Sequence, residues 1–149
     1  RAADQHAKVA FAINDIVSRG EQVTTVDLEE LVLLQRKMLP DTITGQALRV
    51  SSICLGDGVR RVMWSFVDTQ EGGPAWRPMT QDTIPHDALP AMVEQDNVIL
   101  TEMRGTWAPA ISGFAVGQRT FESELAIRPR IVKMMPWEGV SPNNTCPRS

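Results

Sequence analysis

The feature that most constrains the fold is a pair of alternating segments on either side of Gly56-Asp57-Gly58. In both segments apolar or small side chains alternate with their neighbours at a period of two, which is typical of half-buried strands. On one side these are Leu48, Val50, Ser52 and Cys54, and on the other Val62, Trp64 and Phe66. A short glycine-rich turn between two such runs predicts an antiparallel β-hairpin.

Two later segments also predict strands. Asn97–Arg104 is apolar with an alternating pattern, and a second alternation runs from about Thr120 to Lys133. Pro129 lies late in this last segment, which favours an edge strand or a bulge because proline cannot donate to a ladder. We therefore expect four antiparallel strands in a meander.

The first forty residues instead show helical spacing. Small and apolar side chains recur from Ala2 to about Ser18, and Arg19-Gly20 is a typical helix end. A second helix is expected to begin at an N-cap of Thr24 or Thr25 and to end before Pro40, which cannot continue it. Its expected apolar face consists of Leu28, Leu31, Leu34 and Met38.

Together these elements predict an α+β fold with two N-terminal helices packed on a four-stranded antiparallel sheet. A chain of 149 residues with 42% apolar residues is expected to form a single domain over 1–149. Its expected parts are a helical part at 1–40, a sheet at 46–135 and a C-terminal wrap at 136–149. The proline- and glycine-rich residues 69–96 are expected to leave the sheet as a surface excursion.

Charge and hydropathy exclude several classes of partner. The net charge is −3 and no segment concentrates lysine or arginine, so nucleic acid and anionic membrane surfaces are not expected as partners. No apolar stretch approaches the roughly 18–20 residues that a membrane-spanning helix requires.

The residues that carry catalysis or bind metals are sparse. His6 and His86 have no catalytic partner nearby in sequence, and no zinc-binding spacing exists. The acidic residues Asp82, Asp87, Glu94 and Asp96 lack the spacing of a calcium loop. We therefore predict no catalytic residue, no metal site and no cofactor, and we expect that the protein is not an enzyme.

The two cysteines are Cys54, in a predicted strand, and Cys146, in the C-terminal wrap. An even count and an otherwise unanchored tail favour a disulfide between them, which requires an oxidising compartment. The alternative is two free thiols.

The order of several short motifs resembles the TadE/TadF/TadG-type proteins of bacterial tight-adherence (Flp) pili, which are similar to minor pilins and pseudopilins. The matching segments are Arg1–Gly20 with Asp15-Ile16, Val23–Leu28, Leu48–Ile53, Val62-Met63-Trp64-Ser65, Leu89-Pro90 before Asn97–Met103, and Ile127-Arg128-Pro129-Arg130. Trp107 and Pro109 are displaced from the family's usual aromatic residue and proline. The chain is short for a TadG-like protein, so TadE or TadF is the closer comparison.

The resemblance implies a non-enzymatic subunit for pilus initiation, assembly or surface attachment. Its domain would lie in the periplasm, anchored in the inner membrane by a helix preceding Arg1, and either stay there or enter a surface pilus. Its partners would be other pilus-assembly proteins and pilin subunits. Candidate interface residues on the first predicted helix are Ala3, Ala7, Ala10 and Val17.

Two other interpretations use the 69–96 excursion. A small periplasmic enzyme or ligand-binding domain would place Trp76, His86 and Asp87 in a site over the sheet. A third interpretation, compatible with the pilus subunit, is an adhesive head that recognises a glycan or a protein through Trp76 of this excursion and Trp107 beyond it. These two tryptophans and His86 are therefore the surface-loop binding candidates.

Overall fold

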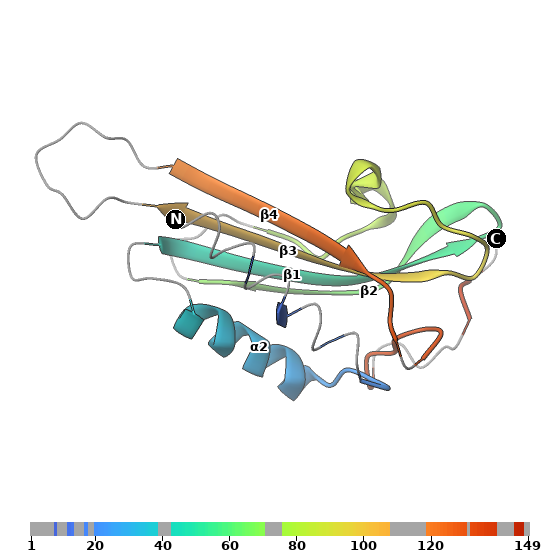
Figure 1. Ribbon diagram of the computed structural model, residues 1–149, viewed down its shortest axis with the longest axis horizontal. Helices are drawn as coiled ribbons and strands as arrows, with labels where there is room; N and C mark the ends of the chain where they lie inside the picture. The colour runs from blue at the N-terminus through green and yellow to red at the C-terminus, as the bar shows by residue number, and fades with distance from the viewer. Residues whose placement is uncertain are drawn as a thin grey trace, which may run out of the picture.

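In the described part of the chain, a four-stranded antiparallel sheet has the helix α2 against one of its faces (Figure 1). The computed structural model describes residues 8, 12, 13, 17, 20–38, 43–70, 76–107, 119–130, 132–139 and 145–147. The strands are β1 (Ile43–Gly56), β2 (Val59–Thr69), β3 (Asn97–Trp107) and β4 (Arg119–Ile127), and the helix is α2 (Thr25–Met38). Two short 3₁₀ turns, η1 (Gln81–Thr83) and η2 (His86–Ala88), lie between β2 and β3.

The predicted hairpin is confirmed, but the predicted meander is wrong at one connection. The strand order is β2-β1-β3-β4, so β3 pairs with β1 and not with β2. The chain reaches that side of β1 at Gln95 and Asp96, which exchange backbone hydrogen bonds with Leu55 of 2.8 and 3.1 Å. β4 is an edge strand, as Pro129 suggested, and ends before that residue.

The prediction of two N-terminal helices packed on the sheet is wrong. The part of the chain that the structure describes contains one α-helix of 14 residues, whereas its strands have 14, 11, 11 and 9 residues. The physical reason is the length of the strands, because together they hold far more of the described residues than α2 does, and β3 runs three residues past the expected Arg104. Most of the first expected helix lies outside the described residues.

Helix α2 begins where its sequence predicts. The Thr24 side chain accepts a hydrogen bond from the Asp27 backbone N–H, and the Asp27 carboxylate accepts one from the Thr24 N–H, both at 3.1 Å. This reciprocal capping satisfies two backbone donors that a helix start leaves without partners. Leu28, Leu31, Val32 and Gln35 are buried against the sheet, whereas Val26 and Leu33 point outward and are 62% and 54% exposed.

The sheet has an apolar core on each face. Under α2, Leu48 and Val50 of β1 pack with Ile99 and Met103 of β3 and with Trp64 of β2. On the opposite face, Ile53, Val98 and Leu100 are covered by Met79, Ile84 and Leu89 from the segment between β2 and β3. Residues 76–92 therefore form a packed layer on the face opposite α2 (Figure 1).

Residues 132–139 and 145–147, here called the C-terminal strap, fasten the helix side of the sheet. The Pro136 carbonyl accepts the Val23 N–H at 2.9 Å, and the Val23 carbonyl accepts the Glu138 N–H at 2.8 Å, immediately before α2. The Trp64 indole donates to the Met135 carbonyl at 2.8 Å. Trp137 packs edge to face against Trp64, with ring centroids 5.7 Å apart.

The predicted disulfide is confirmed. Cys54 of β1 and Cys146 of the C-terminal strap are bonded, with Cα atoms 5.7 Å apart and a separation of 92 positions in sequence. Both are buried with Met134. The side chain of Gln95 reinforces the bond, because it accepts from the Cys146 N–H at 2.8 Å and donates to the Cys146 carbonyl at 3.3 Å.

Among the described residues, no helix is long and apolar enough to cross a membrane.

Candidate functional site

A buried ion pair lies on the sheet face opposite α2. Arg49 of β1 and Glu102 of β3 are cross-strand partners, and the guanidinium donates two hydrogen bonds to the carboxylate, at 2.7 and 2.8 Å. Both residues are only 7% exposed. Arg49 also donates to the Arg77 carbonyl at 3.2 Å. This bidentate geometry is the strongest form of an arginine–carboxylate contact.

Trp76 lies against this pair. Its ring is 4.6 Å from the guanidinium carbon of Arg49 and 4.2 Å from that of Arg104, distances at which cation–π attraction operates. Arg104 is in turn paired with Glu122 of β4 at 3.0 Å. A small, polar hollow of about 280 Å³ adjoins these side chains. Two arginine–glutamate pairs and the Trp76 ring that contacts both arginines thus fasten the start of the 76–92 layer to the sheet.

His86 belongs to a different cluster. Its ring Nδ1 lies 3.2 Å from the Arg60 guanidinium, which also donates to the backbone carbonyls of His86 and Pro90. These contacts hold η2 against β2. Trp76 and His86, which the enzyme interpretation placed together, therefore have separate sets of partners. Trp107 ends β3, and its side chain is not among those described.

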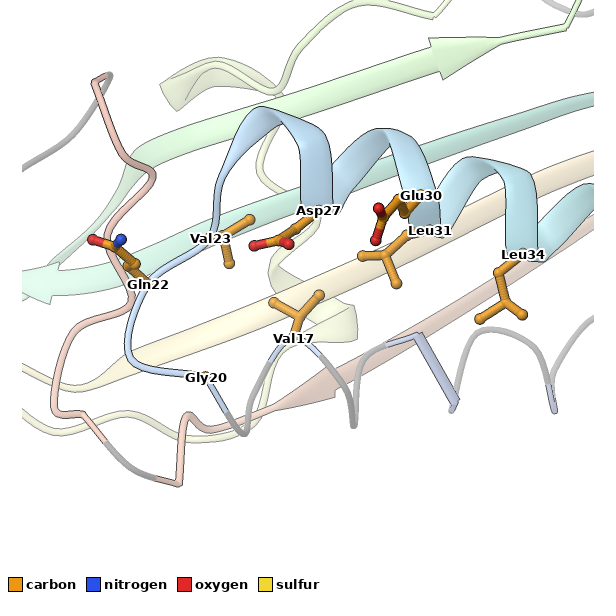
Figure 2. Close-up of a pocket in the computed structure, with 8 residues that line it drawn as sticks. All are labelled: Val17, Gly20, Gln22, Val23, Asp27, Glu30, Leu31 and Leu34. Carbon is orange, nitrogen blue, oxygen red and sulfur yellow. The ribbon is translucent and has the colours of Figure 1, made fainter.

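A second hollow lies beside α2. A groove of about 410 Å³ is bordered by the helix on one side and by Val17 and Gly20 on the other, with Gln22 and Val23 at one end. Figure 2 shows Leu31 and Leu34 pointing from α2 toward Val17, with the carboxylates of Asp27 and Glu30 on the same side of the helix. Its volume falls within the range of ligand-binding clefts, roughly 300–1,000 Å³.

The α2 wall of this groove is one helical stripe. Asp27, Glu30, Leu31 and Leu34 have the i, i+3, i+4, i+7 spacing that places side chains on a single face. The stripe is acidic at its N-terminal end and apolar at its C-terminal end. Leu31 and the facing Val17 are each only 5% exposed, so they form a floor, whereas the two carboxylates are exposed at the rim.

Of the four predicted interface residues, Val17 alone is described. It is buried in the core beneath α2 and also lines the groove. Ala3, Ala7 and Ala10 lie outside the described residues, so their proposed role remains a prediction.

Sequence reasoning missed both the ion pair and the α2 side of the groove. A single arginine in β1 and a single glutamate in β3, each within an apolar strand, were the available signal for a buried pair. The stripe on α2 was visible as helical spacing, but Leu31 and Leu34 were assigned wholly to the core.

The described residues contain no group of three or more histidine, cysteine or acidic side chains placed to hold a metal ion. Comparison of the chain with protein families, with curated proteins and with solved structures finds no match.

Proposed function

We propose that this chain is a non-enzymatic, TadE- or TadF-like minor pilin-type subunit of a bacterial tight-adherence pilus. It acts in pilus initiation, assembly or surface attachment through contacts with other proteins. Its domain lies in the periplasm, held at the inner membrane by a helix that precedes Arg1. The shared order of short motifs along the sequence is the basis for this family.

The observation that carries the proposal is the buried disulfide between Cys54 and Cys146. Structural disulfides persist in oxidising compartments such as the periplasm and are rare in the cytosol. A covalent link between the C-terminal strap and the interior strand β1 suits a domain that works in such an oxidising compartment.

The contacts of the loop candidates also favour a binding subunit over the enzyme interpretation. Trp76 stacks on two guanidiniums and His86 contacts Arg60, so both side chains serve the packing of the 76–92 layer. The groove beside α2 offers apolar surface with an acidic rim, which is a surface for a protein segment.

The test is to delete the gene in the bacterium that carries it and to compare piliation and surface adherence with a complemented strain. We expect fibres and adherence to be lost and then restored. The native protein should be recovered from inner membranes or from sheared fibres, with an apolar helix of about 20 residues ahead of Arg1 in its mass and N-terminal sequence. Unchanged piliation, or a mature chain lacking that helix, would overturn the proposal.

A second variant examines the predicted interface. Aspartate at Ala3, Ala7 and Ala10 is expected to impair fibre assembly while the thermal midpoint of the purified domain changes little. Equal losses of assembly and stability would instead assign these alanines to packing within the domain.

A further inference from the structure

We propose that the groove beside α2 is the docking site for a helical segment of a partner protein that presents lysine or arginine one to two turns from apolar side chains. This inference rests on the proposed function, because it names the chemistry of the partner that a binding subunit would hold. The proposed occupant is a helix of a partner protein, and occupation by a second copy of this chain is an outcome that the test distinguishes.

The first step is the distribution of charge along the groove. Asp27 and Glu30 lie at one end of the α2 stripe and Leu31 and Leu34 at the other. From Asp27 to Leu34 the helix advances by about 10 Å, at 1.5 Å per residue. Asp27 and Leu31 are about 6 Å apart along the axis by the same rise. A complementary segment therefore needs a cation and an apolar side chain about 6 to 10 Å apart, which a helix supplies at i and i+4 or i and i+7.

The second step is the state of the two carboxylates. Asp27 accepts the Thr24 N–H through one carboxylate oxygen, while Glu30 has no ion-pair partner among the described residues and is exposed. A cationic side chain at the rim could therefore pair with the Asp27 and Glu30 carboxylates. Glu29 lies on the adjacent face of α2 and lines a different hollow with Arg36 and Asp68. The acidic rim of the groove therefore consists of Asp27 and Glu30 and does not include Glu29.

The third step is the apolar floor. Val17, Val23 and Leu31 are each at most 5% exposed, and the groove between them still has room for side chains from outside. Insertion of an apolar ridge into such a groove, with charge at the rim fixing its direction, is the usual way in which an amphipathic helix binds a protein. The rim charge would add specificity and salt dependence more than affinity.

The experiment measures binding of a defined probe by nuclear magnetic resonance of methyl groups. The probe is a 16-residue helical peptide with leucines at i, i+3 and i+7 and two lysines one turn beyond them. Its control replaces the lysines with glutamates. We expect the lysine peptide to shift the methyl signals of Val17, Leu31 and Leu34, and the glutamate peptide to bind at least tenfold more weakly.

Matched variants locate the charge effect. Glu30→Gln is expected to weaken binding of the lysine peptide about three- to fivefold, the effect of one exposed ion pair. Glu29→Gln, which removes the same charge from the neighbouring hollow, should leave the affinity unchanged. Circular dichroism of both variants verifies that α2 is intact, because Glu30 takes no part in the cap.

Three results would overturn the inference. The peptides could bind equally, the lysine peptide could shift no groove methyl, or the groove methyl signals could change on self-association of the domain, with a dimer confirmed by sedimentation. Because these measurements use the purified domain, they are independent of the gene deletion. Binding without a piliation defect would remove the pilus proposal alone, and a piliation defect without binding would remove the groove alone.

Discussion

Arg49 and Glu102 face each other across β1 and β3 and are joined by two hydrogen bonds, in a position where both side chains are buried. Removing one member of such a pair leaves an uncompensated charge in the interior, at a cost of about 3–5 kcal/mol. We expect Glu102→Leu to lower the free energy of unfolding by that amount in urea titrations.

The double variant Arg49→Met, Glu102→Leu provides the control. Because it removes both charges, it should recover most of the loss. The alternative result is a double variant whose loss of unfolding free energy equals the sum of the losses of the two single variants. It would show that the attraction between the two charges does not account for the cost of removing either one.

A second prediction concerns the disulfide. The bond joins cysteines that are 92 positions apart in sequence, so breaking it releases a long loop in the unfolded chain. The expected loss for Cys54→Ser, Cys146→Ser is about 4–5 kcal/mol in the chain-entropy treatment. Thiol labelling of the unfolded, unreduced protein should find no free cysteine. Two labelled thiols would contradict the bond directly.

A third prediction compares two glycines at the β1–β2 turn. A Cβ on Gly56 would overlap the Pro147 carbonyl oxygen and lie 3.1 Å from the Cys146 sulfur, so Gly56→Ala must displace the C-terminal strap. We expect a cost of about 1–3 kcal/mol, as for other overpacked sites. The cost should shrink when both cysteines are serine, because the strap can then move away.

The neighbouring Gly58 is the matched case. A Cβ there meets no atom within 4 Å, but φ is +72°, so Gly58→Ala strains only the backbone. Its cost should be the same with and without the disulfide. A double-mutant cycle measures how far the stability cost of each glycine variant changes when the disulfide is removed. If the cost changes equally for Gly56→Ala and Gly58→Ala, the close approach of the strap to Gly56 is contradicted.

A fourth prediction separates the two sides of α2. Leu28 is fully buried and Leu33 is 54% exposed on the same helix. Leu28→Ala should lower the free energy of unfolding by about 2–5 kcal/mol, through lost burial and a residual cavity. Leu33→Ala should change it by less than about 0.5 kcal/mol, as most surface substitutions do. Similar losses at both positions would mean that α2 does not pack as described.

The local elements were predictable because their causes are local. The turn at Gly56-Asp57-Gly58 lies between alternating residues, and the Thr24 cap lies next to the acidic first turn of α2. The disulfide was predictable because two cysteines allow one intramolecular pair. In each case the residues that determine the feature are adjacent in sequence or unique in type.

Features that depend on distant segments were not predictable. Alternation along β3 assigns Glu102 to a face, but it does not say that Arg49 lies opposite. The choice of β1 over β2 as the neighbour of β3 depends on how residues 70–96 cross the sheet. Helical spacing in the first forty residues predicted two helices packed on the sheet, whereas among the described residues the four strands far outweigh the single continuous helix α2.

The position of the C-terminal strap has a mechanical consequence. Tension applied to the chain at Gly20 reaches Val23 before it reaches α2. The backbone N–H and carbonyl of Val23 are both hydrogen-bonded to the strap, at Pro136 and Glu138. The strap is covalently joined to β1 in the middle of the sheet. Force applied at Gly20 would therefore be borne partly by the strap and, through the disulfide, by β1, and not by α2 alone. We expect single-molecule pulling to give a rupture force that falls when the disulfide is reduced.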